Sequence, residues 1–104
     1  MKTYTLLLYR NPHDPDDPQA WYGIVPAVQG VLSDGDSLDE AVTMTTDALE
    51  GMLEVILERG HALPENTFDL AAAKQWASEL FGDVALEFET KEAKIKIGVN
   101  ALAA

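Results

Sequence analysis

The chain has 104 residues and a mass of 11.3 kDa, which suits one globular domain. Its residues are 47% hydrophobic and 24% charged, a composition that is too apolar for a disordered chain. Its 18 acidic and 7 basic residues give a formal net charge of −11, which argues against direct nucleic-acid binding by this chain alone and favours a basic partner protein. The absence of cysteine excludes disulfides, thiolate metal sites and cysteine nucleophiles.

The N-terminal residues 2–10 are predicted to form a strand. They are a short run of mostly aromatic, leucine and threonine residues, which is typical of strands. The apolar part is far too short for a signal peptide or a membrane span, so we expect a cytoplasmic protein without a membrane role. The Pro- and Asp-rich segment 11–19 is predicted to be a long connection, because proline lacks the amide donor of a strand ladder.

Two further strands are predicted at residues 21–25 and 28–32. Pro26 lies between them and marks a bend or an edge position, because proline is rare inside a sheet. Gly23 and Gly30 are expected to relieve crowding against neighbouring elements, since glycine has no Cβ.

The clearest local signal is the start of a long helix after the Ser-Asp-Gly-Asp stretch. Gly35 is expected to take a positive φ in this turn, and Ser37 with Glu40 three residues later has the spacing of a capping box. Gly60 is predicted to follow the helix end. Apolar residues between these signals recur at three- and four-residue steps and predict one stripe packed on the sheet: Leu38, Ala41, Val42, Thr45, Leu49, Met52, Leu53 and Ile56.

A second, shorter helix is predicted over residues 68–81. Asn66 or Thr67 is its expected N-cap, and Gly82 is expected to stop it. A run of three alanines near its start favours the helical state. Two large side chains of this helix are expected to point toward the core, namely Trp76 and Leu80.

The C-terminal part is predicted to be a hairpin of two half-buried strands. Apolar residues alternate with others at residues 84–89 and again at 94–99, with the link Thr-Lys-Glu-Ala between these segments. Outward Glu and Lys side chains could pair across the two strands. The expected fold class is therefore α+β, a small antiparallel sheet with one long helix packed on it, plus a second shorter helix and C-terminal strands.

Motifs for catalysis or metal binding are weak. His13, Asp14, Asp16 and Asp17 offer ligand atoms, but their segment lacks the spacing and the glycine of a calcium loop. Glycine-rich phosphate-binding patterns are absent from the sequence, and neither histidine stands in a recognisable arrangement with a serine. We therefore expect no enzyme activity, metal or cofactor. A small hydrolase that uses clustered carboxylates and a divalent ion stays open as an alternative.

One face of the long helix is uniformly acidic. Asp47, Glu50, Glu54 and Glu58 are spaced by three, four and four residues, so they stack on one face without an interleaved basic residue. The row is either an ordinary solvated face or a contact surface for a cationic protein. It is our candidate partner-binding site.

The segment WYGIVPAVQGVLSDGDSLDEA, residues 21–41, resembles the core of the HicB family of antitoxins. The family pattern runs from a strand aromatic through a valine-proline step and a glycine to glycine-aspartate, a hydroxyl residue and Leu-x-Glu-Ala. The stretch ERGHALPE, residues 58–65, is similar to the family's helix end. The matching positions in residues 21–41 are Tyr22, Val25, Pro26, Gly30, Gly35, Asp36, Ser37, Leu38, Glu40 and Ala41.

This resemblance implies both a fold and a partner. The implied fold is a small sheet with one long helix, a reduced relative of the RNase H fold without a catalytic carboxylate cluster. The implied function is that of an antitoxin that binds and neutralises a small basic mRNA-cleaving toxin of the HicA type. Complementary charge would speed the encounter of an acidic antitoxin with a basic toxin.

HicB antitoxins often carry a C-terminal ribbon-helix-helix or helix-turn-helix segment for operator DNA. No such segment is recognisable here, so we expect residues 1–104 to form a single HicB-like domain without a DNA-binding part. Exposed sheet edges favour a homo-oligomer. The alternative function is a stand-alone HicB-like assembly or regulatory module with no toxin partner.

Overall fold

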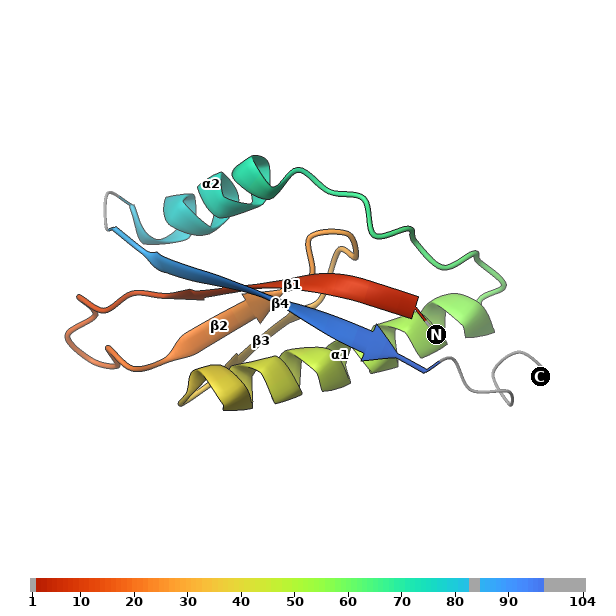
Figure 1. Ribbon diagram of the computed structural model, residues 1–104, viewed down its shortest axis with the longest axis horizontal. Coiled ribbons are helices and arrows are strands. Elements are labelled where there is room, and N and C mark those ends of the chain that lie inside the picture. The colour runs from red at the N-terminus through yellow and green to blue at the C-terminus, as the bar shows by residue number, and fades with distance from the viewer. Residues whose placement is uncertain (1, 83–84, 97–104) are drawn as a thin grey trace.

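The computed structural model describes residues 2–82 and 85–96 and shows a sheet with a helix on each face (Figure 1). In chain order the elements are β1 (Lys2–Arg10), β2 (Trp21–Ile24), β3 (Leu32–Gly35), α1 (Leu38–Glu58), α2 (Leu70–Phe81) and β4 (Glu87–Ile95). The strands lie in the order β3-β2-β1-β4, and every neighbouring pair is antiparallel. The predicted α+β class is confirmed.

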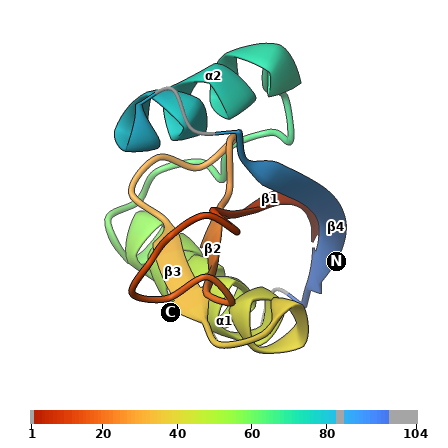
Figure 2. The same ribbon diagram turned by 90° about the vertical axis from the view of Figure 1, so that its left-hand side faces the viewer.

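The central strand β1 buries side chains on both faces of the sheet, which explains its near-continuous apolar sequence. Side chains alternate between the two faces of a strand. Tyr4, Leu6 and Leu8 accordingly belong to the core on the α1 side. Leu7 and Tyr9 belong to the core on the α2 side. Figure 2 shows the resulting three layers, with α1 and α2 on opposite sides of the sheet.

Both helices end, and α1 begins, where the sequence predicts. Ser37 Oγ accepts a hydrogen bond from the Glu40 N–H at 3.1 Å. Gly60 and Gly82 follow the two helices with φ of 77° and 73°, which favours glycine. The predicted stripe of α1 faces the sheet: Ala41, Thr45, Leu49 and Leu53 are buried, and Leu38, Val42, Met52 and Ile56 are half-buried.

Two glycines let α1 approach the sheet closely. A Cβ on Gly23 would lie 2.9 Å from Leu8 Cδ1 and 3.0 Å from Thr45 Cβ, so the predicted relief of crowding is confirmed there. A Cβ on Gly35 would lie 2.5 Å from the backbone nitrogen of Ala41. The predicted positive φ at Gly35 is wrong, because this residue ends β3 in an extended conformation. Its lack of a side chain serves the helix approach instead.

The chain after β2 is a turn, so the predicted strand at residues 28–32 is wrong. The Val28 N–H donates to Val25 O at 2.9 Å, and Gly30 has a φ of 91°, which L side chains rarely adopt. β3 begins only at Leu32. Val25 and Val28 are buried although they lie in a turn, which explains why this apolar run resembles a strand.

The predicted C-terminal hairpin is also wrong, because β4 is one continuous strand. The Thr-Lys-Glu-Ala link, residues 90–93, lies within β4 and pairs with residues 4–7 of β1. β1 is 9 residues long and offers ladder partners along its whole length. The link also lacks the glycine, proline or asparagine of a tight turn. Residues 85, 86 and 96, also predicted as strand, lie outside β4, and the predicted positions 84 and 97–99 lie outside the described residues.

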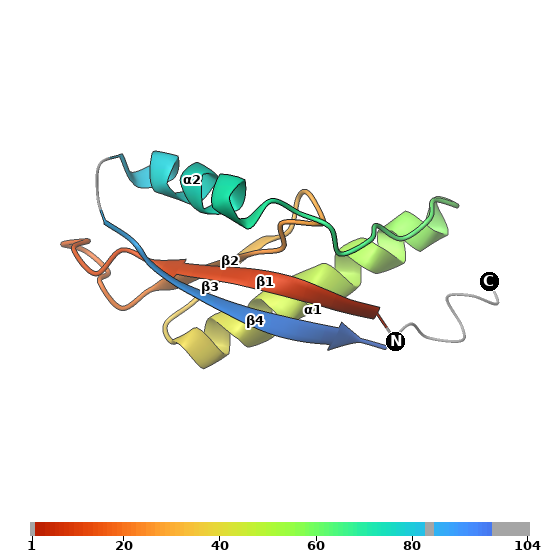
Figure 3. The same ribbon diagram turned by 45° about the horizontal axis from the view of Figure 1, so that its top comes forward.

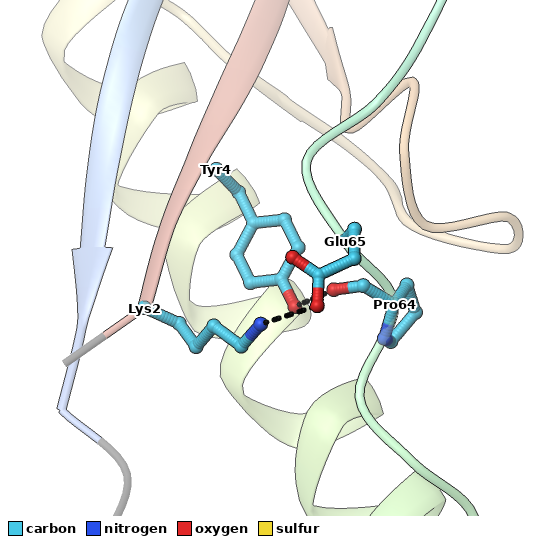
Figure 4. A network of polar contacts seen from close by, with 4 residues as sticks. All are labelled: Lys2, Tyr4, Pro64 and Glu65. Carbon is cyan, nitrogen blue, oxygen red and sulfur yellow. Dashed lines mark hydrogen bonds and ion pairs between the residues drawn. The ribbon is translucent and has the colours of Figure 1, made fainter.

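The linker between the helices, residues 59–69, is fastened to the start of β1. Figure 4 shows that the Tyr4 hydroxyl donates to the Pro64 carbonyl, at 2.5 Å. Lys2 Nζ lies 3.4 Å from Glu65 Oε1 in the same group of contacts. The linker thereby crosses from the α1 side to the α2 side of the sheet (Figure 3).

The predicted N-cap of α2 at Asn66 or Thr67 is wrong, because Asn66 bonds to β1. Its Oδ1 accepts from the Thr5 N–H at 3.0 Å, and its Nδ2 donates to Thr5 Oγ1 at 3.2 Å. β2 pairs only with the last four residues of β1, so Asn66 supplies an acceptor that the sheet does not. The N-cap is Asp69, whose Oδ1 accepts from the Ala72 N–H at 3.1 Å.

α2 turns small side chains toward the sheet, so the inward orientation predicted for Trp76 and Leu80 is wrong. Ala77 is fully buried, whereas Trp76 and Leu80 are 44% and 56% exposed. The sheet beneath α2 already carries the stacked rings of Tyr9 and Tyr22, with centroids 5.5 Å apart. Alanine is small enough to lie over this aromatic layer, and the larger side chains are displaced to the flank of the helix.

The close contact at Gly23 yields a matched pair of glycine variants. Gly23→Ala should lower the free energy of unfolding by about 1–3 kcal/mol, because the added methyl group overlaps Leu8 and Thr45. Gly51→Ala, within α1, should raise it by about 0.5–1 kcal/mol, since its Cβ would meet no atom within 4 Å. Urea denaturation measures both changes. If the free energy of unfolding changes in the same direction in the two variants, this account is contradicted.

The cap of α1 can be tested by removal and rescue. Ser37→Ala should lower the free energy of unfolding by about 1 kcal/mol, because the Glu40 N–H loses its acceptor. Ser37→Asp should restore most of this loss, since aspartate accepts the same bond and suits a helix N-terminus. Thermal denaturation of the two variants should therefore show unequal shifts. Equal destabilisation by both would show that the cap bond is not responsible.

Burial raises the pKa of Tyr9 to about 12, with a smaller contribution from neighbouring Tyr22. Because the folded pKa lies above the ordinary value of 10.0, the stability that depends on neutral Tyr9 is complete below about pH 10 and is lost as pH rises toward 12. Tyr9→Phe should lose less stability than the wild type across this interval. Urea denaturation at a series of alkaline pH values measures the difference, and parallel losses would exclude Tyr9 as the source.

Candidate partner-binding surfaces

The predicted acidic surface lies on the outer side of α1. At about 100° per residue, its four carboxylates lie opposite the buried stripe of the helix, and all four residues are exposed. Within residues 2–82 and 85–96 the ion pairs are Lys2–Glu65 and Arg10–Glu87, so these carboxylates have no cationic partner there. We call them the acidic row: Asp47, Glu50, Glu54 and Glu58.

Apolar side chains accompany the acidic row along one flank. Met44 and Val55 are 45% and 38% exposed, and helical spacing places both on the same side of the row. Gly51 lies between them, with open space where its Cβ would be. The outer side of α1 thus combines uniform negative charge with accessible apolar surface.

The motif residues around the start of α1 form a structural junction rather than a cleft. Gly35 and Ala41 meet at the closest approach of sheet and helix, and Ser37 caps the helix. Asp36 and Glu40 are exposed beside this cap. These residues hold α1 in place, and they offer no converging set of polar atoms.

The Asp-rich segment 11–19 uses its polar side chains to hold its own turns. Asp14 Oδ1 accepts from the Asp16 N–H at 2.9 Å and from the Asp17 N–H at 3.3 Å. Asn11 Oδ1 accepts from the His13 N–H at 3.0 Å. Within the described part of the chain, no three His, Asp or Glu side chains are grouped so that they could hold a metal ion. Nor is any helix in that part long and apolar enough to cross a membrane.

An apolar groove of about 520 Å³ lies between α2 and the turn after β2. One wall is that turn, including Pro26 and Gly30 of the motif described above. The other wall is formed by Phe68, Ala72 and Trp76, at the start of α2 and just before it. We call this feature the α2 groove.

Three carboxylates act on Tyr22, at the far end of the same face of the sheet. Tyr22 lies under the C-terminal end of α2, with its ring centroid 5.8 Å from that of Phe81. Burial raises the pKa of Tyr22, and the negative charges of Asp14, Asp17 and Asp34 raise it further. The α2 side of the sheet therefore has an apolar groove at one end and an acidic environment at the other.

The α2 groove was not predicted from the sequence, although α2 carries a signal for it. Its apolar residues form two adjoining stripes rather than one. The stripe that contacts the aromatic layer contains Leu70, Ala73, Ala77 and Phe81. Ala72, Trp76 and Leu80 form a second stripe at four-residue spacing. A short helix that covers one face needs only one stripe, so the second indicates surface left free for another contact.

Comparisons with known proteins show one family and a fold shared with solved structures. A family model described as the HicB-like antitoxin of bacterial toxin-antitoxin systems matches residues 11–101, whereas no curated protein matches. The crystal structure of the N-terminal domain of Burkholderia pseudomallei antitoxin HicB is similar over 91% of this chain and 99% of that chain, with a TM-score of 0.53 and 20% identity. The crystal structure of Burkholderia pseudomallei antitoxin HicB is similar over 99% and 80%, with a TM-score of 0.50 and 19% identity. At these identities the two structures show a shared fold.

Proposed function

Because the chain belongs to the HicB-like antitoxin family of bacterial toxin-antitoxin systems, we propose that it binds and neutralises a small basic toxin of the HicA type. The acidic row on α1 is the observation that carries this proposal. It places four exposed carboxylates on one regular helix, without an ion-pair partner among the described residues. The chain acts in this proposal by occupying a surface of the toxin, without catalysis or a cofactor of its own.

The acidic row has unfavourable electrostatics until a cation approaches it. Like charges at three- and four-residue spacing destabilise an isolated helix by about 0.2–0.5 kcal/mol per pair. A basic surface that docks on the row removes this repulsion and adds attraction. The net charge of −11 also steers a basic partner from a distance, so complementarity raises the association rate and adds specificity.

The exposed apolar side chains beside the acidic row supply the apolar part of such an interface. Stable interfaces combine a desolvated apolar centre with a polar rim. Met44 and Val55 provide exposed apolar surface beside the carboxylates. Gly51 leaves the helix backbone between them uncovered, so a partner can approach α1 closely at this point.

Neutralisation follows from competition with RNA. A toxin that cleaves mRNA must bind phosphates, and cationic side chains provide most of that affinity. An acidic protein that covers those side chains excludes RNA from the same surface. The same charge disfavours direct nucleic-acid binding by the antitoxin chain alone.

Self-association completes the proposal. β3 and β4 are the outer strands of the sheet, and within residues 2–82 and 85–96 each has one edge without a strand neighbour. Exposed strand edges readily pair with another chain, and most homo-oligomers are symmetric. We therefore include a homo-oligomer, acting in the cytoplasm where the toxin meets mRNA.

The first test is whether a gene for a small basic protein lies beside this one, followed by co-expression of the two proteins. The antitoxin should suppress the growth arrest that this protein causes alone, and the two should copurify as a complex of defined mass. If the neighbouring protein is absent, or remains toxic and unbound, the toxin-binding proposal fails. The stand-alone module would then be the better account.

Charge reversal on α1 tests the contact surface. Glu50→Lys combined with Glu54→Lys should weaken toxin binding about tenfold or more, because two attractive contacts become repulsive. The salt dependence of the affinity should also decrease, since screened ion pairs are lost. Titration calorimetry at several salt concentrations measures both quantities.

A second double variant with the same change of net charge serves as the control. Glu89→Lys with Glu92→Lys alters two exposed residues of β4 and should change affinity much less. Equal weakening by the two double variants would show that only net charge matters. The acidic row would then not be the contact surface, even if the toxin itself is bound.

A further inference from the structure

The helix that carries the acidic row, α1, and α2 lie on opposite sides of the sheet (Figure 2), and the α2 groove lies between α2 and the turn after β2. We propose that this groove binds a short segment of the basic partner protein, one in which apolar side chains are flanked by lysine or arginine. The proposal rests on the proposed function, because it assigns a second contact to the same partner. It names the groove as the apolar anchor of the complex.

The geometry of the groove suits a few side chains rather than a folded domain. Its volume of about 520 Å³ is within the range of pockets that hold small ligands, roughly 300–1,000 Å³. Trp76 forms part of one wall, and the valines of the turn after β2 form the other. Gln29 and Asp69 are the polar side chains among its lining residues, so the surface is mostly apolar.

Exposed apolar side chains extend this surface beyond the groove. Among the described residues, five large hydrophobic side chains are exposed, and three of them are Trp76, Leu80 and Leu32. Leu80 follows Trp76 by one helical turn. Leu32 pairs with Ile24, which lines the groove. Because directly paired residues share one face of a sheet, Leu32 lies on the α2 side, where it is 59% exposed.

The charges on the α2 side favour a basic occupant. Asp69 is among the residues that line the groove, and no Lys or Arg is. Beyond the groove, Tyr22 lies near Phe81 of α2, and the negative charges of Asp14, Asp17 and Asp34 raise its pKa. Lys74 of α2 lies on the other flank of the helix, where its Nζ is 5.4 Å from the centre of the Phe88 ring in β4.

A second copy of this chain is a poor occupant for the same reason. The surface of a second copy is rich in carboxylates, with 18 Asp and Glu against 7 Lys and Arg in the chain, and the groove offers them Asp69 and no Lys or Arg, so like charges would oppose association at this site. A segment with apolar side chains between basic ones suits both the apolar lining and the carboxylates near α2. Trp76 supplies the type of residue that most often dominates binding energy.

Tryptophan fluorescence tests the groove in the unmodified protein. Trp21 is only 8% exposed and Trp76 is 44% exposed, so acrylamide quenching of the free chain reports mainly on Trp76. Adding the basic protein encoded beside this gene should shield Trp76 and reduce quenching. Complex formation with undiminished quenching would overturn the groove proposal and leave the proposed function standing. Failure to form any complex would overturn both.

Variants on the exposed flank of α2 separate binding from folding. Trp76→Ala should weaken binding of the same protein about tenfold or more, and Trp76→Phe should retain most of the affinity. Gln75→Ala changes the neighbouring exposed residue and serves as the control, with less than about a twofold effect. Melting temperatures of all variants establish that the fold persists. Equal affinities for the wild type and Trp76→Ala would refute the proposal.

A pair of charge variants at Leu80 tests the chemistry of the occupant. Leu80 is 56% exposed, so both Leu80→Lys and Leu80→Glu should fold. Leu80→Lys should weaken binding more than Leu80→Glu, because the added cation repels a basic segment. If Leu80→Glu weakens binding more than Leu80→Lys, the occupant is not basic and the proposal is overturned. If Trp76 becomes shielded with rising protein concentration and the molecular mass doubles, both without partner, a second copy occupies the groove and the proposal is likewise overturned.

Discussion

The close approach of α1 to the sheet at Gly23 and Gly35 is the constraint on which the rest of the structure depends. A side chain at either position would overlap Thr45 or the backbone at Ala41. Contact at these points lays the apolar stripe of the helix against β2 and β3, and the remaining residues of α1 must then face solvent. The acidic row is outward because the glycines hold the opposite side of the helix inward.

The central strand β1 divides the molecule into two unequal cores. On the α1 side, a long helix with a regular apolar stripe covers the sheet. On the α2 side, the stacked rings of Tyr9 and Tyr22 lie beneath a short helix, whose own Phe81 packs against both. The middle of this second helix packs through alanine, and Trp76 and Leu80 remain at its flank. The α2 groove is a consequence of this shallow packing against an aromatic layer.

The two candidate surfaces differ in their physical contribution to binding. Charge on α1 acts over distance and mainly affects encounter and specificity, whereas apolar anchors in a groove mainly affect how long a complex persists. The helices beside these surfaces, α1 and α2, lie on opposite sides of the sheet (Figure 1), so one partner can use both surfaces only by extending a segment around the molecule. An antitoxin that uses both surfaces would contact the main part of its toxin through the acidic row and an extended segment of the toxin through the α2 groove.

The sequence by itself determined α1, its cap at Ser37 and its acidic row, because capping, helical periodicity and charge spacing depend on residues close together in the chain. The motif around Gly35 also identified the family, although its backbone conformation was predicted wrongly. Only the tertiary structure decided that β4 is one strand, that Asn66 bonds to β1 instead of capping α2, and that Trp76 faces outward. Each of these outcomes depends on a partner far along the chain, whose position local propensity does not encode.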